Sequence, residues 1–137
     1  MELEPLFEIN AEIGVPTVIA NAPGGTRVIV PVTGGKFEGP RLKGMVEASG
    51  ADWFLIRPDG IGVIDVRLLL KTDDGEAIYM TYTGRGTMGA SGLQGISTAP
   101  TFEASTKGKY AWLNSVQAIA EGETTPGGVR HKLFVRK

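Results

Sequence analysis

The stretch that decides the fold is residues 61–85, IGVIDVRLLLKTDDGEAIYMTYTGR. Two runs rich in β-branched and aromatic residues, 61–71 and 77–85, flank the turn sequence Asp73-Asp74-Gly75. An Asp-Gly pair between two such runs is typical of a tight β-hairpin, because glycine readily adopts the positive φ that these turns need. The stretch therefore predicts two long antiparallel strands.

Outside this hairpin, glycine and proline divide the chain into further short strands. They are expected at residues 3–9, 26–33, 41–47, 53–57, 101–105, 110–119 and 129–136. Pro31 predicts an edge or a bulge in the second of these, because proline has no N–H to donate to a ladder. For the segment at 110–119, a helix over 109–120 is an alternative to a strand.

Two glycine-rich segments are interpreted as non-strand. Residues 86–100, GTMGASGLQGISTAP, predict a mobile loop that acts as a lid, and residues 122–128 predict a turn region. The many short strands need their edges protected, and closing the sheet into a barrel does this. We therefore expect one all-β domain spanning residues 1–137, an antiparallel barrel of about eight to ten strands. A two-sheet sandwich is the alternative.

Composition narrows the range of functions. The 137 residues suffice for one domain, and the formal net charge of −1 gives no reason to expect a nucleic-acid partner. The absence of cysteine excludes disulfides, thiolate metal sites and cysteine nucleophiles. No apolar run approaches a membrane span, and the N-terminus does not resemble a signal peptide. We expect a cytoplasmic protein with no membrane partner, no metal and no cofactor.

Four ordered motifs carry a resemblance to a known family. They are GGKFEGP at 34–40, GADW at 50–53, DDG followed by Ile78-Tyr79 at 73–79, and KYAWLN at 109–114. Together they resemble the bacterial and fungal family called domain of unknown function 3237, over nearly the whole chain. The resemblance implies a small antiparallel barrel related in outline to the calycins, and it implies no particular reaction or catalytic residues. The family often has two glycines before Ala-Asp-Trp, where this chain has Ser49-Gly50.

Strand side chains alternate between two faces, so parity groups the candidate residues. In residues 61–71 the even positions are purely apolar, whereas the odd positions include Asp65 and Arg67. Either face could line the barrel. Asp65 is interpreted as a general base, with Arg67 orienting it or holding an anionic group of the substrate. Alternatively, the two residues form an exposed or structural ion pair. Tyr82 lies on the opposite face from Tyr79 and is a candidate donor to an oxyanion.

Four further candidates are the two tryptophans and their polar neighbours, and among them Trp53 is a candidate ligand-binding residue. Asp52 beside Trp53 is a candidate acid or base at a cavity mouth, or alternatively a turn residue. Trp112 and Asn114 share a face if their segment is a strand, and they are candidate ligand-binding residues. His131, the only histidine, is more readily interpreted as a packing or rim residue than as a proton shuttle.

These residues support three hypotheses about function. The first is a cofactor-independent isomerase, cyclase or lyase acting on a small organic molecule in the barrel lumen. The second is a lipocalin-like carrier with the same cavity and no catalysis. The third is a filled barrel that serves as an oligomeric scaffold, with an apolar outer face covered by a second copy in a homodimer or larger homo-oligomer.

Overall fold

The computed structural model describes residues 1–137, and nearly all regular structure in it is β-strand. The strands are β1 (Leu3–Ile13), β2 (Thr17–Ala22), β3 (Gly25–Glu38), β4 (Lys43–Ile56), β5 (Ile61–Thr72), β6 (Ala77–Gly89), β7 (Gly92–Thr98), β8 (Thr101–Glu103), β9 (Ile119–Thr125) and β10 (Gly128–Arg136). One 3-10 helix, η1 (Ala111–Ser115), lies between β8 and β9. Nothing helical in the chain is long and apolar enough to cross a bilayer.

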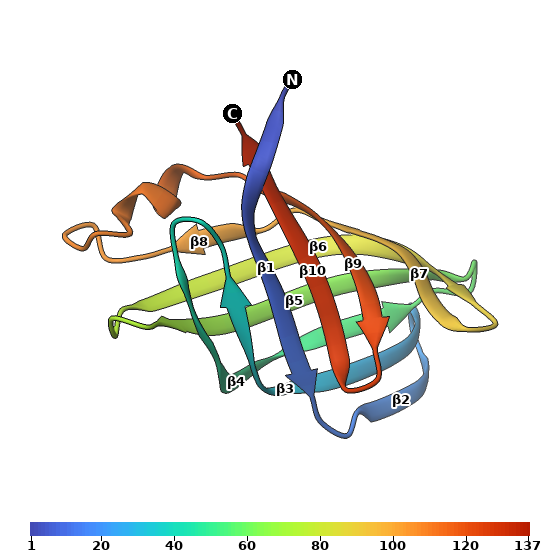
Figure 1. The fold of residues 1–137 in the computed structure, drawn as a ribbon. Helices are drawn as coiled ribbons and strands as arrows, with labels where there is room; N and C mark the ends of the chain where they lie inside the picture. Colours follow the sequence, from blue (N-terminus) through green and yellow to red (C-terminus); the bar gives the residue numbers. More distant parts are fainter.

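Eight of these strands close into an antiparallel barrel (Figure 1). The order is β1-β10-β9-β7-β6-β5-β4-β3, and pairing between β1 and β3 completes the ring. β2 extends β3 beyond the ring, and β8 pairs with β6. The two chain ends lie together at one end of the molecule, where the Lys137 N–H donates to the Glu2 carbonyl. The expected all-β barrel is confirmed.

The central hairpin is also confirmed. β5 and β6 pair without interruption from Ile61 opposite Thr87 to Lys71 opposite Ala77. At the turn, Gly75 has a φ of 90°, a conformation that side chains disfavour. The even positions of β5 point into the barrel, since Ile64, Val66, Leu68 and Leu70 are at most 4% exposed. The structure thereby decides which of the two faces lines the lumen.

The residues predicted as two strands at 41–47 and 53–57 form the single bent strand β4. Its register against β5 shifts between Val46 and Gly50, which is a bulge. A Cβ at Gly50 would lie 2.1 Å from the Arg67 carbonyl oxygen, so only glycine fits there. β3 has a similar irregularity after Pro31, as the proline predicted.

The expectation of a mobile loop at residues 86–100 is wrong. This segment forms the end of β6 and the whole of β7, and the predicted turn at 122–128 is mostly β9. Gly86 in this segment and Gly84 just before it allow close approach of strands, whereas Gly92 and Gly95 adopt positive φ. A Cβ at Gly86 would lie 2.7 Å from the Leu93 side chain, and one at Gly84 would lie 2.1 Å from the Ser97 carbonyl oxygen. Gly84 and Gly86 thus serve packing within the sheet, and Gly92 and Gly95 serve turns and irregularities in it.

Residues 110–119 do not form the expected strand. They contain η1, and the Asn114 side chain makes two hydrogen bonds to the backbone of Ala104, at 2.7 and 2.9 Å. The Tyr110 hydroxyl donates to Asp74 in the β5–β6 turn, which ties this segment to the hairpin. Side chain to backbone bonds of this kind compete with strand formation.

The strand β2 was not predicted from the sequence.

The lumen is packed solid in one half and hollow in the other. In the solid half, the rings of Phe7 and Phe37 lie 5.3 Å apart and those of Phe7 and Phe102 lie 5.8 Å apart. Leu113 from η1 and Leu133 from β10 are fully buried in the same cluster. Further along the same strands the side chains leave a cavity, and this half of the barrel holds the candidate site.

Candidate functional site

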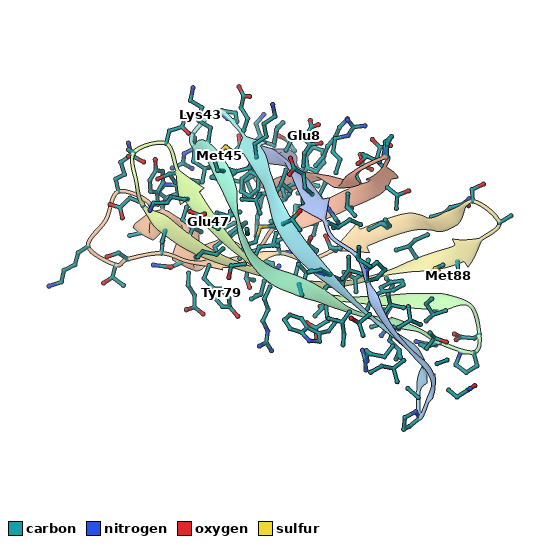
Figure 2. The ribbon with its side chains drawn as sticks, turned by 90° about the horizontal axis from the view of Figure 1, so that it is seen from below. Glu8, Lys43, Met45, Glu47, Tyr79 and Met88 are labelled. Carbon is teal, nitrogen blue, oxygen red and sulfur yellow. The ribbon has the colours of Figure 1, made fainter.

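The hollow half of the lumen contains a cavity of about 190 Å³ lined by fifteen residues. Every one of the eight barrel strands contributes at least one of them. Only Asp52, Tyr82, Thr124 and His131 bring polar groups, and all the other lining side chains are apolar. The cavity opens to solvent beside Ile13, which lines it and is 40% exposed. Figure 2 shows another lining residue, Met88, near the tip of the β6–β7 hairpin, far from Glu8 and Lys43.

Asp52 is the only carboxylic acid in this cavity. Its side chain is partly buried, and burial raises its pKa from the ordinary value of 3.8 to about 7. A hydrogen bond from the Asp65 backbone N–H to Oδ1, 3.1 Å long, opposes this rise, and the negative charge of Asp65 adds to it. Because the pKa lies near neutrality, both the acid and the base form are available at physiological pH.

The local backbone explains why the Asp52 carboxyl lies where it does. Asp52 pairs with Val66 on β5 and Leu55 pairs with Val63, while the two β4 residues between them, Trp53 and Phe54, form no pair with β5. In this gap the Asp65 N–H donates to the Asp52 side chain. The carboxyl is thus anchored to the barrel wall by one oxygen, and Oδ2 makes no hydrogen bond within the protein.

Tyr82 and His131 lie next to each other in the same cavity. Their rings are 5.1 Å apart, and the two residues are 6% and 4% exposed. The Tyr82 hydroxyl makes no hydrogen bond within the chain, and burial together with the charge of Asp52 raises its pKa above the ordinary value of 10.0. The phenol therefore stays protonated at neutral pH and can donate a hydrogen bond.

Burial has the opposite effect on His131, lowering its pKa from 6.5 to about 4, so the imidazole is neutral. Its Nε2 is enclosed and has no hydrogen-bond partner. This nitrogen lies against Gly122 of β9, where a Cβ would come within 2.7 Å of it. His131 is a buried packing residue, one of the two outcomes expected for it, and it also lines the cavity although it was not among the predicted site residues. Its position between Arg130 and Lys132, which face outward, was the available signal that it points inward.

The structure separates the other predicted residues from the cavity. Asp65, Arg67 and Trp53 lie on the outer face of β4 and β5, and all three are exposed. The Arg67 guanidinium lies 5.7 Å from the Trp53 ring. Asp52 and Trp53 are neighbours in one strand and therefore point to opposite faces, so the expected contact of carboxylate with indole does not form.

Trp112 and Asn114 also lie outside the cavity. Arg41 stacks on the Trp112 ring at 3.6 Å, and the Asn114 amide both accepts from and donates to the backbone of Ala104. Both residues belong to the segment that contains η1, and their contacts hold that segment together. The expectation that they bind a ligand inside the barrel depended on a strand that does not form.

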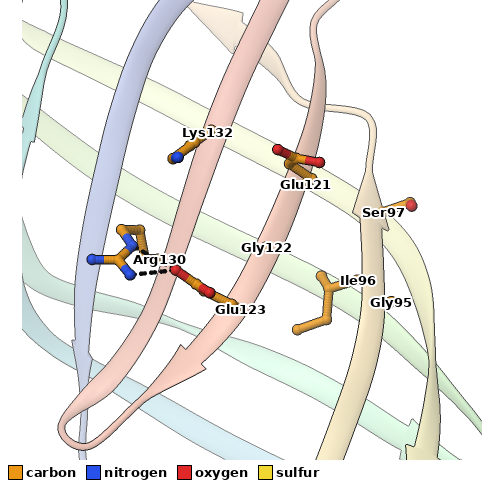
Figure 3. Close-up of a pocket in the computed structure, with 8 residues that line it drawn as sticks. All are labelled: Gly95, Ile96, Ser97, Glu121, Gly122, Glu123, Arg130 and Lys132. Carbon is orange, nitrogen blue, oxygen red and sulfur yellow. Dashed lines mark hydrogen bonds and ion pairs between the residues drawn. The ribbon is translucent and has the colours of Figure 1, made fainter.

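A second hollow lies on the outer surface of β7, β9 and β10 (Figure 3). It is lined mainly by charged side chains, two acidic and two basic. Arg130 is already paired with Glu123, and the charges of Glu121 and Lys132 balance. The hydrogen bond from Arg130 lowers the pKa of the Glu123 carboxyl, which stabilises an exposed ion pair and makes Glu123 a weaker base. No group of three or more His, Asp or Glu side chains in the chain is placed to hold a metal ion.

Comparison with known proteins places this barrel in a family. The family described as "Protein of unknown function (DUF3237)" matches residues 1–135. The UPF0311 protein RPA1785 of Rhodopseudomonas palustris is 33% identical over 61% of this chain, and the matched stretch spans 55% of that relative's length. The UPF0311 protein of Clostridium acetobutylicum is 29% identical, over 98% of this chain and 93% of the relative.

Solved structures with the same fold agree with this placement. A β-barrel-like protein from Acinetobacter baumannii has a TM-score of 0.90 and 30% identity, covering 99% of this chain and 96% of that one. A protein from Penicillium herquei, described as an enzyme, has a TM-score of 0.77 and 24% identity, covering 98% and 94%, and shares the fold. The chain therefore belongs to the DUF3237 family of proteins of unknown function.

Proposed function

We propose that this barrel catalyses proton transfer on a small organic molecule bound in its lumen, without a cofactor. Asp52 is the general base, and the Tyr82 hydroxyl donates a hydrogen bond to the oxygen on which negative charge develops. The observation that carries the proposal is a single carboxyl group, with a pKa raised to about 7, in a predominantly apolar cavity.

The chemistry follows from these two groups. Asp52 takes a proton from a carbon next to a carbonyl group, the C–H electron pair forms the carbon–carbon double bond of an enolate, and the carbonyl π pair moves onto oxygen. Tyr82 stabilises that oxygen by hydrogen bonding, and a preorganised donor of this kind is worth about 100-fold in rate. Returning the proton to another carbon gives an isomerase, and attack of the enolate or loss of a leaving group gives a cyclase or lyase.

The surroundings suit this division of roles. The apolar walls keep water away from the carboxyl, which raises its basicity and strengthens the hydrogen bond from Tyr82. The fold itself accommodates catalysis, since the Penicillium herquei protein that shares it is described as an enzyme. Asp65 and Arg67, the alternative base and anchor from the sequence analysis, have no part in the proposal because they point away from the cavity.

Enolate formation can be tested before the natural substrate is known. A panel of small ketones, including cyclohexanone, is incubated with the protein in D2O, and NMR follows replacement of the α-protons by deuterium. We expect the wild type and Asp65→Asn to accelerate exchange of at least one ketone, and Asp52→Asn to abolish it. Equal exchange with the wild type and Asp52→Asn would overturn the proposal.

A carrier function is the second candidate, favoured by the predominance of apolar side chains in the cavity lining. It predicts that ketones bind without any exchange of their α-protons. The third hypothesis, a filled scaffold, predicts no cavity at all and has less support than either.

A further inference from the structure

We infer that the natural ligand of the cavity is an uncharged carbonyl compound whose bound part is about the size of one six-membered ring. This inference deepens the proposed function and rests on it for the requirement that Asp52 be free to act as a base. It rests independently on the charges, the unpaired polar groups and the volume of the cavity.

An anionic ligand has no partner in this cavity. None of the fifteen lining residues is lysine or arginine. Arg67 lies outside the barrel, and Arg130 is engaged by Glu123. A carboxylate or phosphate would lose its hydration in an apolar lumen beside Asp52, and such burial without compensation costs several kcal/mol. Anions are therefore excluded from the inner part of the site.

A cationic ligand would be tolerated poorly for a different reason. An ammonium ion would pair with Asp52, stabilise its charged form and lower its pKa, so that the carboxylate could no longer act as a base near neutral pH. The pair would also be enclosed by apolar side chains, where the attraction barely repays the loss of hydration of both ions. Only a neutral ligand leaves the basicity of Asp52 intact.

Two unpaired polar groups indicate what the neutral ligand must carry. The Tyr82 hydroxyl lines the cavity and makes no hydrogen bond within the chain. The Nε2 of His131 is enclosed and has no partner at all. Buried polar groups without partners are rare in proteins and call for an explanation. A carbonyl oxygen on the ligand would accept the hydrogen bond from Tyr82, and the neutral imidazole beside it adds no charge to the site.

The volume sets the size of the bound part. An apolar cavity of about 150 Å³ holds benzene, and this cavity measures about 190 Å³. The space therefore accepts one six-membered ring with its carbonyl oxygen. Because the cavity opens beside Ile13, substituents on the ring can extend into solvent.

Three compounds with the same ring test the inference: cyclohexanone, cyclohexanecarboxylate and cyclohexylammonium. At about pH 7 they are neutral, anionic and cationic, as ordinary pKa values dictate. His131 is the only histidine, so its imidazole signals in the NMR spectrum report on the cavity without ambiguity. Each compound is titrated into the wild type and into Val30→Phe, which fills the cavity from β3. Ile29→Phe, on the opposite face of the same strand, is the matched control.

We expect cyclohexanone to shift the His131 signals and to bind at least about tenfold more tightly than either charged compound. The shift should be lost in V30F and retained in I29F. Binding of a charged compound as tight as that of cyclohexanone, or no binding by any of the three, overturns the inference. Should V30F not fold, the three wild-type titrations decide. Cyclohexanone binding without α-proton exchange would overturn the proposed function and leave the ligand class standing.

Discussion

The Oδ1 atom of Asp52 accepts a hydrogen bond from the backbone N–H of Asp65, 3.1 Å away on the neighbouring strand. Two acidic residues thus meet at one point of the barrel wall with different roles. Asp65 contributes its backbone and directs its carboxylate to solvent, whereas Asp52 directs its carboxyl into the cavity. A single hydrogen bond positions Asp52 and is too little to offset its burial, so its pKa stays raised.

Asp52→Asn should stabilise the protein at alkaline pH while abolishing proton transfer. The folded protein holds the Asp52 proton up to a pKa of about 7, whereas the unfolded chain releases it near 3.8. The stabilisation linked to this proton is therefore complete below 3.8 and is lost as the pH rises to about 7. Asparagine cannot ionise, so at pH 8 the variant should be more stable by up to about 4 kcal/mol, at 1.36 kcal/mol per pKa unit.

Urea denaturation at pH 4 and pH 8 measures this difference. Asp65→Asn is the matched control, because Asp65 is exposed and its backbone N–H is unchanged by the substitution. A free energy of unfolding for Asp52→Asn that equals the wild-type value at both pH values would contradict the burial of a titrating carboxyl.

His131 should contribute a pH dependence of the opposite sign. Its folded pKa is about 4 and its ordinary value is 6.5, so the unfolded chain takes up a proton in this range that the folded protein does not. The corresponding stability is present above pH 6.5 and is lost as the pH falls to about 4. In the wild type, the contribution of His131 to the free energy of unfolding rises with pH while that of Asp52 falls. The two contributions should largely cancel between about pH 4 and 6.5.

Single variants should separate the two contributions. Stability should rise with pH over this window in Asp52→Asn and fall with pH in His131→Gln, as measured by urea denaturation at half-unit steps. Parallel curves for the two variants would show that one of the groups is not buried as described.

Tyr82→Phe should reduce catalysis far more than stability. The hydroxyl has no partner within the chain, so its removal should change the free energy of unfolding by less than about 1 kcal/mol. Loss of the hydrogen bond to the developing oxyanion should slow α-proton exchange about 100-fold. Thermal denaturation measures the change in stability, and the exchange assay measures the change in rate. An unchanged exchange rate would remove Tyr82 from the mechanism.

Gly122→Ala should disturb the cavity through His131. The added Cβ would lie 2.7 Å from Nε2 of His131 and 2.9 Å from Cγ2 of Ile96, so the imidazole must move. Overpacking of this kind costs about 1–3 kcal/mol. Gly127→Ala is the control, because nothing lies within 4 Å of a Cβ there. The His131 NMR signals should shift in G122A and stay in place in G127A.

Arg67→Ala should leave exchange activity intact. Its guanidinium contacts the outer face of Trp53 and does not reach the cavity. Exposed substitutions of this kind change stability by about 0.5 kcal/mol or less. If Arg67→Ala lost exchange activity without losing stability, Arg67 would take part in the site as the substrate anchor that was predicted from the sequence.

Local patterns in the sequence were enough for the hairpin at residues 61–85, for the bulge after Pro31 and for the separation of Tyr79 from Tyr82. Each depends on a turn of two or three residues or on the alternation of side chains along one strand. The same patterns gave a wrong prediction at residues 86–100, where glycines that serve close packing (Gly86) or a positive φ (Gly92 and Gly95) within β6 and β7 were interpreted as flexibility. The strand predicted at residues 110–119 does not form, because the hydrogen bonds of Asn114 to Ala104 and of Tyr110 to Asp74 favour η1 over a strand.

Strand alternation in the sequence placed Asp65 and Tyr82 on definite faces of their strands but left open which face is the inside. That choice depends on barrel closure, through pairing of β1 with β3, and on whether the apolar even face of β5 gains more by burial than the mixed odd face. Closure turns Asp65 outward and brings Asp52, Tyr82 and His131 together from β4, β6 and β10. Residues this far apart in the chain meet only when the ring is complete, so the tertiary structure alone decided the site.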